Sequence, residues 1–420
     1  MTVRLLFLCH AHPDLQAGGT EIFARDLFRT LRRDFGAEGL FLAGTFAGQR
    51  PRSPGTPFQT VGGAPDEVLL WTAGFDPFFQ SQIDLHGVMP ELATLLRELR
   101  PDVVHIHHLM TLGVEVVGLV RRVLPHARMV MTLHDYYALC PRDGQMVTTS
   151  GTLCQTPSVD SCRLCFPDRG LTDVRLRRLH VDTALDQIDR FIAPSRFLRD
   201  RFVANGMDPA RITVLANGIP EANPTPHREA ADGRRDRFGF FGHINRFKGA
   251  TVALAASARL SKAGVAHTLA LHGSAAHQTA DFADTFATAL AAAPDARHVG
   301  PYARADLARR MAGVDWVVVP SVWWENAPLV IMEAFQHRRP VICSDIGGMA
   351  EAVRDGVDGL HAPVDDAGGL AETMRRAIET PGLWQRLVEG ITPPVAITAA
   401  AAAHHEFYRG LLAAGARRAA

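Results

Sequence analysis

One order of elements occurs in both halves of this chain: a short apolar segment, a loop that contains glycine, and a helix-forming segment. In the first half, the apolar segment spans residues 3–9, the loop residues 10–19 and the amphipathic helix residues 20–33. In the second half, residues 238–241 are followed by the loop 242–249 and an alanine-rich helix. Short buried strands that alternate with helices predict an α/β fold with one Rossmann-like sheet in each half.

The length of 420 residues also favours two domains. Residues 220–237 are rich in Pro, Glu, Ala and Arg and poor in apolar residues, as is typical of a linker. We therefore predict a first domain over residues 1–219, a second over 238–395, and a final helical segment over 396–420.

Charge and hydropathy exclude two classes of protein. The formal net charge is zero, so the chain lacks the basic excess that attracts nucleic acid. The apolar run at residues 5–9 is too short for a signal peptide, and no other stretch reaches ~18 uninterrupted apolar residues. We expect a cytoplasmic protein without a nucleic-acid partner.

The stretch over residues 316–335 carries the most specific signal. An apolar strand leads through a loop containing Glu325 to Pro328, which suits the first turn of a helix. Glu333 follows in an apolar run, where a carboxylate is costly unless satisfied, and a sugar diol matches its two oxygens. The N–H groups at the helix start suit phosphate or sugar oxygens. The alternative is a surface carboxylate at Glu325 and a satisfied core group at Glu333.

The segments Pro-Ser, Glu-Asn-Ala-Pro-Leu and Glu-Ala-Phe within this stretch resemble the donor site of family 4 glycosyltransferases, which has two glutamates separated by seven residues. The resemblance covers nearly the whole chain. It implies the GT-B fold, with two Rossmann-like domains facing an interdomain cleft and a final helix that crosses back to the first domain. It also implies retaining transfer of a sugar from a nucleotide-diphosphate donor to a hydroxyl acceptor: a glycan, a lipid-linked sugar or a small molecule.

The resemblance assigns roles to residues of the second half. Glu333 would hold the ribose, and Glu325 the donor sugar or phosphate region. Lys248, at a helix entrance, would meet the diphosphate. The family usually has Arg directly after the first glycine of that loop, where this chain has His243, and Arg246 could supply the guanidinium instead. The predicted donor-binding residues are Gly18, Gly19, Gly242, His243, Arg246, Lys248, Tyr302, Asn326, Ala327, Pro328, Leu329 and Glu333.

Three histidines follow apolar strands in the first half: His105, His107 and His134. Parallel strands that end in polar residues mark the edge of a sheet where ligands bind. A hydrogen-bonded structural role is the alternative for each. The resemblance places a Thr-x-His-Asp turn beside the transferred sugar, which favours His134. The predicted catalytic residues are Glu325, His134 and Lys248.

Four cysteines lie in a loop, over residues 140–165, that has little apolar content to fold it. Their thiolates suit a tetrahedral structural zinc, with disulfides or four free thiols as alternatives. The predicted ligands are Cys140, Cys154, Cys162 and Cys165. No Asp-x-Asp pair occurs, so Lys248, Arg246 and helix termini would neutralise the leaving diphosphate without a divalent metal.

Other functions stay open at this point. A sugar-nucleotide epimerase of GT-B type is the nearest enzymatic alternative, and His243 in place of Arg is compatible with a non-catalytic carbohydrate-binding scaffold. A dinucleotide dehydrogenase is disfavoured because no Gly-x-Gly-x-x-Gly follows a strand. Arg25, Arg29, Arg32 and Arg33 form one face of the first helix. That face is either solvated or in peripheral contact with the inner side of an anionic membrane.

Overall fold

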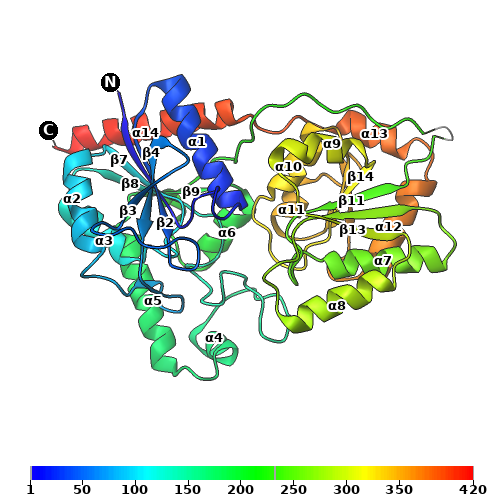
Figure 1. The fold of residues 1–420 in the computed structure, drawn as a ribbon, viewed down its shortest axis with the longest axis horizontal. Helices are drawn as coiled ribbons and strands as arrows, with labels where there is room; N and C mark the ends of the chain where they lie inside the picture. The colour runs from blue at the N-terminus through cyan, green and yellow to red at the C-terminus, as the bar shows by residue number, and fades with distance from the viewer. Residues whose placement is uncertain (1, 231–232, 420) are drawn as a thin grey trace. The chain divides into compact units, whose positions relative to one another are not determined.

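The computed structural model describes residues 2–230 and 233–419. The chain divides into two compact units, which Figure 1 shows with their elements labelled. The first consists of Met1–Pro220 and Val395–Ala420, and the second of Glu221–Pro394. Each unit has its own sheet and its own hydrophobic core.

The sheet of the first unit has eight strands in the order β10-β9-β8-β7-β1-β2-β4-β3. Neighbouring strands are parallel except for β3 and β4, which are antiparallel. In the centre, Leu6 pairs with Leu40 on one side and Val104 on the other. The strands are β1 (Arg4–Cys9), β2 (Glu38–Thr45), β3 (Phe58–Val61), β4 (Ala64–Trp71), β7 (Val103–Ile106), β8 (Arg128–Thr132), β9 (Arg190–Ala193) and β10 (Ile212–Val214).

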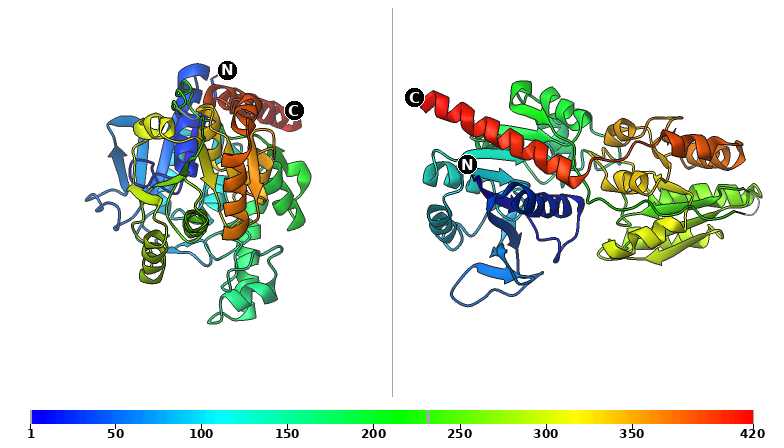
Figure 2. Two further views of the ribbon diagram at one scale, coloured as in Figure 1. Left: turned by 90° about the vertical axis from the view of Figure 1, so that its right-hand side faces the viewer. Right: turned by 90° about the horizontal axis from the view of Figure 1, so that it is seen from above.

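Helices cover this sheet because their apolar faces pack onto its buried residues. Helices α1 (Gly19–Phe35) and α14 (Ile397–Ala419) pack against one another (Figure 2), and both contribute to the core around Phe7. Helix α3 (Glu115–Val123) contacts both α2 (Met89–Leu99) and α5 (Leu171–Asp186). The remaining elements are α4 (Val159–Cys165), α6 (Arg196–Ala204), η1 (Pro209–Arg211) and the short strands β5 (Phe75–Asp76) and β6 (Ser81–Gln82).

The sheet of the second unit has six parallel strands in the order β13-β12-β11-β14-β15-β16. Numbered along the chain, this is the 3-2-1-4-5-6 order of the doubly wound nucleotide-binding sheet. Its strands are β11 (Arg237–Phe241), β12 (Thr268–His272), β13 (Ala296–Gly300), β14 (Trp316–Val319), β15 (Val341–Ser344) and β16 (Gly359–Ala362).

Two helical layers enclose this second sheet. Residues of four helices share a core with Phe238 and Trp316: α7 (Ala250–Lys262), α8 (Ala280–Ala291), α12 (Ala367–Glu379) and α13 (Leu383–Gly390). On the other face, Val317 and Val341 pack with α9 (Leu307–Ala312), α10 (Leu329–Gln336) and α11 (Gly347–Ala352). The short η2 (Arg304–Asp306) precedes α9.

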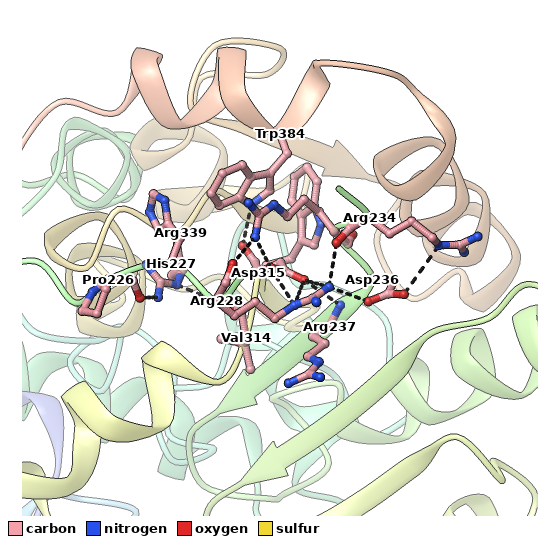
Figure 3. A network of polar contacts seen from close by, with 12 residues as sticks. Pro226, His227, Arg228, Arg234, Asp236, Arg237, Val314, Asp315, Arg339 and Trp384 are labelled. Carbon is pink, nitrogen blue, oxygen red and sulfur yellow. Dashed lines mark hydrogen bonds and ion pairs between the residues drawn. The ribbon is translucent and has the colours of Figure 1, made fainter. Parts of the chain in front are cut away.

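The segment predicted as a linker is attached to the second unit. Arg228 Nε donates to the buried Asp315 carboxylate at 2.9 Å, and Arg339 Nη2 donates to the Pro226 carbonyl at 2.8 Å (Figure 3). Buried charges of this kind need partners, and the linker supplies them. The segment is therefore not a free spacer, and Arg237, assigned to it from sequence, begins β11.

Other boundaries differ from those expected. Residues 36–90, where short apolar runs alternate with Gly and Pro and give no clear strand pattern, contain β2 to β6. The sequence pattern over residues 369–390 indicates one helix, but the structure has two, α12 and α13, because Pro381 cannot continue a helix and Gly382 adopts a left-handed φ of 72°. No helix in the described part of the chain combines the length and apolar character that a membrane span requires.

Candidate functional site

The site in the second unit is built where the order of its strands reverses. β11 and β14 are neighbours, but α7 packs on one face of the sheet and α10 on the other. In doubly wound sheets, ligands bind beside the carboxyl ends of two such strands. The loops 242–249 and 320–328 follow these ends and contain most of the predicted donor-binding residues.

Two glycines let the backbones of these loops approach closely. Gly249 has a φ of 71°, and an added Cβ would lie 1.8 Å from the Pro320 carbonyl oxygen. Gly348, at the start of α11, donates its N–H to the Glu325 carbonyl at 2.7 Å, and a Cβ there would lie 1.9 Å from the Asn326 carbonyl oxygen. Larger side chains at either glycine would separate the loops, so their geometry depends on these residues.

Lys248 and Glu325 form an ion pair across the two loops. Lys248 Nζ lies 2.6 Å from Glu325 Oε1, which also accepts hydrogen bonds from Ser321 Oγ at 2.8 Å and Trp323 Nε1 at 2.9 Å. The Glu325 carboxylate is buried, whereas the Lys248 side chain is about one-third exposed. An ammonium has three N–H donors, so Lys248 held in this way can still bind an anion.

Glu333 differs from Glu325 because its carboxylate has no hydrogen-bond partner among the described residues. Its side chain is half-buried on α10, and burial raises its pKa to about 7, although the guanidinium of Arg304 acts in the opposite direction. Within residues 2–230 and 233–419, its carboxylate makes no hydrogen bond or ion pair. The carboxylate oxygens can therefore accept hydrogen bonds from the hydroxyl groups of a ligand.

Tyr302 lies in the same region of the second unit. Its ring meets Phe241 edge-on at 5.9 Å and His272 at 6.4 Å, and the Arg310 guanidinium lies 5.4 Å from its centre. Burial and the nearby Glu333 carboxylate raise the pKa of Tyr302. Arg304, Arg310 and His272 were absent from the predicted site. His272 could have been found, because it ends β12 at the ligand-binding edge.

The glycine-containing loop after β11 contains a neutral histidine, His243, at the position where the family usually has Arg. Gly242 has a φ of 145°, and an added Cβ would meet no atom within 4 Å. His243 is exposed and its Nδ1 lies 2.8 Å from the Ser274 carbonyl oxygen. Burial and the nearby Lys248 lower the pKa of His243, so it carries no charge at neutral pH. Arg246 is exposed, with its guanidinium 5.4 Å from the ring of Phe247.

The residues before α10 are arranged slightly differently from the prediction. Pro328 has φ −67° and ψ 115°, so it is the cap residue and Leu329 begins the helix. The prediction of Pro328 in the first turn was wrong by one position. Asn326 is buried and Ala327 half-buried in the loop that precedes it.

Histidines at the carboxyl edge of the first sheet contact one another and the final helix. His105 Nδ1 lies 2.6 Å from the Tyr408 hydroxyl, and its Nε2 lies 2.7 Å from Thr132 Oγ1. His107 Nδ1 lies 3.0 Å from His134 Nε2. Burial lowers the pKa of His134 to about 3, so its ring is neutral at neutral pH. The structure brings the three predicted histidines together, and His134 presents a neutral ring rather than a charge.

Two further histidines, absent from the predicted site, form ion pairs at this edge. His10 Nε2 lies 2.8 Å from Glu21 Oε1, and His108 Nε2 lies 2.7 Å from Asp135 Oδ2. Their rings are 4.6 Å apart. Burial opposes protonation of His10, but contacts with Cys9 and Glu21 raise its pKa to about 9. Each ring is thus matched with a carboxylate of the protein itself.

Gly18 and Gly19 lie at the start of α1, where a donor contact was predicted. A Cβ at Gly18 would lie 2.5 Å from Oε2 of the buried Glu21. The Glu21 carboxylate therefore occupies the space beside Gly18 and complements the helix dipole. A donor contact at Gly18 and Gly19 stays a prediction.

Comparison with known families identifies the chain. The family described as "Glycosyltransferase Family 4" matches residues 17–223, and the family described as "Glycosyl transferases group 1" matches residues 235–380. The D-inositol 3-phosphate glycosyltransferase of Mycobacterium sp. (strain JLS) is 30% identical over 207 residues, 47% of each chain. The chain belongs to glycosyltransferase family 4.

This family 4 glycosyltransferase spans about half the length of the curated relatives it matches. Besides the inositol phosphate enzyme, the glycogen synthase of Mycobacterium tuberculosis (strain CDC 1551 / Oshkosh) is 32% identical over 178 residues, 42% of each chain. The matched fractions are too short to carry the relatives' substrates over to this chain.

Solved structures show the same two-domain α/β fold. Sucrose-phosphate synthase from Thermosynechococcus elongatus aligns with a TM-score of 0.71 at 18% identity, over 98% of this chain and 100% of that chain. HepE of Anabaena in complex with UDP and glucose aligns with a TM-score of 0.67 at 17% identity, over 97% and 100%. The family 4 chain therefore has a GT-B-like fold, with a parallel sheet in each unit.

The arginines of α1 do not present free positive charge. Each of the four predicted for a basic face forms an ion pair with a nearby carboxylate. The pairs join Arg25 with Asp14, Arg29 with Glu67, Arg32 with Asp66 and Arg33 with Asp34. Because each charge is matched, this face gives no support to the predicted contact with an anionic membrane.

Proposed function

We propose that this family 4 glycosyltransferase transfers a sugar from a nucleoside-diphosphate sugar to a hydroxyl acceptor. The carrying observation is the Glu333 carboxylate, half-buried and without a partner among the described side chains, on the helix that follows the strand-order reversal of the second unit. A ribose or sugar diol would supply the two hydroxyl donors that a desolvated carboxylate needs.

Lys248 and helix starts would carry the diphosphate. The Glu325 carboxylate holds the Lys248 ammonium at the entrance of α7, where the helix dipole also favours an anion. As the bond from the anomeric carbon to the diphosphate breaks, negative charge grows on the leaving oxygen. Lys248 would stabilise that charge without a divalent metal. Metal independence and retention of anomeric configuration are parts of this proposal.

Uridine nucleotides are the first donors to test, because the structural neighbour HepE was crystallised with UDP and with UDP-glucose. His134 is assigned to the side of the transferred sugar. Its half-buried ring is neutral at neutral pH, so it would face the sugar without introducing a second charge. The acceptor is assigned only as a hydroxyl compound.

The chain allows a sharp binding test because it contains only two lysines, Lys248 and Lys262. Reductive methylation followed by peptide mass spectrometry would report both in one sample. We expect UDP or UDP-glucose to protect Lys248 and leave the exposed Lys262 as an internal reference. Equal labelling of Lys248 with and without UDP, ADP and GDP nucleotides would contradict the proposed donor site.

Product analysis then separates the possible functions. Transfer of a labelled sugar to an added acceptor supports the glycosyltransferase. Conversion of the donor into an epimer without an acceptor would identify an epimerase instead. Protection of Lys248 with no turnover of any donor would identify a non-catalytic binding protein.

A further inference from the structure

The four cysteines predicted to bind zinc lie between β8 and α5, and none of them forms a disulfide. Within residues 2–230 and 233–419, no group of three metal-ligating side chains is placed to hold an ion. The zinc site therefore stays a prediction from the sequence.

Trp323 of the second unit lies beside the donor site without being a core residue. It belongs to the loop between β14 and α10, and it is half-buried, whereas its neighbour Trp324 is buried. The N–H of Glu325 donates to the Trp323 carbonyl at 2.9 Å, so the chain makes a tight turn between them. This turn places the indole of Trp323 next to the Glu325 carboxylate.

The indole N–H takes part in holding that carboxylate. Trp323 Nε1 donates to Glu325 Oε1 at 2.9 Å. The same oxygen accepts from Ser321 Oγ at 2.8 Å and from Lys248 Nζ at 2.6 Å. A carboxylate oxygen has about two lone pairs, so three donors fill its hydrogen-bonding capacity. Trp323 thereby helps to fix the oxygen that holds the Lys248 ammonium.

The indole ring contacts the ammonium as well. Lys248 Nζ lies 5.6 Å from the centre of the Trp323 ring, within the range of a cation–π attraction. The ring of Phe247 lies 6.5 Å from that of Trp323, and the Val322 N–H donates to the Phe247 carbonyl at 2.9 Å. The loops 242–249 and 320–328 are therefore joined through backbone and side chains beside Lys248.

The backbone of Lys248 is fixed by other residues. The N–H groups of Phe247 and Lys248 both donate to Asn245 Oδ1, at 2.9 and 3.0 Å. Beyond the backbone, lysine has a flexible four-carbon stem, so these bonds do not place its ammonium. Among the described residues, Glu325 and Trp323 supply the contacts that do.

We propose that Trp323 is a positioning residue for Lys248: its indole N–H and ring hold the Glu325–Lys248 pair, so that the ammonium is fixed before the donor binds. The proposal rests on the proposed function, in which Lys248 meets the diphosphate. A lysine that is already immobilised loses little further rotamer freedom when the donor binds. Replacing Trp323 should therefore weaken diphosphate binding only through Lys248.

Lysine labelling tests the position of the ammonium in the absence of any donor. We expect reductive methylation of Lys248 to be about threefold faster in Trp323→Leu than in the wild type, because a contact of the ammonium is lost. Lys262 is the internal reference in each sample. Trp323→Phe keeps a ring without the N–H and should label at an intermediate rate.

Trp71→Phe is the matched control for the loss of an indole hydrogen bond. Trp71 is half-buried on β4 of the first unit, and its Nε1 donates to the Arg50 carbonyl at 3.1 Å. Its replacement should leave the labelling rate of Lys248 unchanged.

A double-mutant cycle then tests the route of the effect. Trp323→Leu should weaken UDP binding about fivefold in the wild type and cause no further loss in Lys248→Ala, because Trp323 acts through Lys248. Calorimetric titration measures both. A further fivefold loss in the Lys248→Ala background would mean that Trp323 contacts the nucleotide itself, and would overturn the proposal.

The labelling result can also reject the proposal. Equal labelling of Lys248 in Trp323→Leu and in the wild type would show that Trp323 does not hold the ammonium. If Trp323→Leu does not fold, Trp323→Phe carries both tests. If the wild type binds no nucleotide, the proposed donor site fails, whereas labelling of the free protein still decides whether Trp323 positions Lys248.

Discussion

The carboxyl edges of the two sheets satisfy their ionisable side chains in opposite ways. At the first, His10 is matched with Glu21, and His108 with Asp135. At the second, Lys248 is matched with Glu325, but Glu333 has no partner among the residues that the structure describes. The first edge is therefore closed electrostatically, because these charges are matched within the protein, although His107 Nε2 is buried there without a hydrogen-bond partner. The second edge is electrostatically incomplete.

This difference shows where to look for a ligand when two similar folds occur in one chain. A buried carboxylate without hydrogen bonds costs free energy in the free protein, and a ligand can recover that cost on binding. A histidine already paired with a carboxylate has no such cost to recover. The incomplete edge is the better candidate for donor binding, and variants at each edge should respond differently.

The largest effect is expected at the Lys248–Glu325 pair. Lys248→Ala leaves the buried Glu325 uncompensated and should lower the free energy of unfolding by about 3 kcal/mol. It should also weaken UDP binding about 100-fold, or about 2.7 kcal/mol. Urea denaturation and calorimetric titration measure the two effects.

The controls separate stability from binding. Lys262→Ala should change neither quantity. Adding Glu325→Gln to Lys248→Ala should restore most of the stability, because no buried charge is left unpaired, but should not restore UDP binding. A single Lys248→Ala variant as stable as the wild type would show that the ion pair contributes nothing.

The next effect tests the closed edge through the pH dependence of stability. The pKa of His10 is about 9 in the folded protein, above its usual value of 6.5. The His10–Glu21 contact therefore stabilises the fold fully below about pH 6.5 and is lost as the pH rises through 9. The expected loss between pH 6 and pH 10 is about 2–3 kcal/mol.

Urea denaturation across this range should give a flatter profile for His10→Gln than for the wild type. His86→Gln is the control, because His86 is exposed and should leave the profile unchanged. His108 and Asp135 face His10 from the loops that follow β7 and β8, and His108 titrates with it, so the double variant His10→Gln/His108→Gln should be flattest. A wild-type profile in His10→Gln would contradict a protonated, paired ring.

A smaller effect of opposite sign is expected at the incomplete edge. The pKa of Glu333 is about 7, above its usual 4.5, so its ionisation destabilises the folded protein progressively as the pH rises through 7. Glu333→Gln should therefore raise the free energy of unfolding at pH 8 by about 1–2 kcal/mol, after allowance for its partial exposure. At pH 4 the variant and the wild type should be equally stable.

The pH dependence of donor binding should also report the ionisation of Glu333. If Glu333 accepts hydrogen bonds from the ribose, UDP-glucose affinity should rise with pH between about 6 and 8 in the wild type and stay level in Glu333→Gln, because the diphosphate diester of UDP-glucose does not itself ionise in this range, unlike the terminal phosphate of UDP. Calorimetric titration at several pH values measures this. An unchanged pH dependence in the variant would remove Glu333 from the donor site.

The sequence predicted those elements whose pattern is local. The buried strands β1, β11 and β14 are short apolar runs with clear ends, and the loops that follow them were placed correctly. Residues 36–90 were not interpretable because β3 has only four residues and pairs antiparallel with β4 at the edge of the sheet, and because burial along β4 is irregular. Periodicity is weak wherever a strand is only half-covered.

The side-chain partners could not be predicted. Lys248 and Glu325 are 77 residues apart, and only the strand order brings their loops together. His10 was overlooked because its partner, Glu21, lies in the first turn of α1 and looks like an ordinary first-turn acid. The linker was misjudged for a similar reason, since its arginines bind an aspartate of the second unit.

The smallest effect concerns the position where the incomplete edge departs from the usual family pattern. His243 is exposed and neutral, so the loop after β11 holds less positive charge than an Arg would provide. His243→Arg should strengthen UDP binding about fivefold, or about 1 kcal/mol, because an exposed charge is screened by water. The gain should shrink as salt is added. Gln385→Arg, an exposed position on α13 of the same unit, adds the same charge outside this loop, controls for net charge and should change affinity less. Equal gains in both variants would mean that the diphosphate senses only the overall charge, and that the loop after β11 does not contact it.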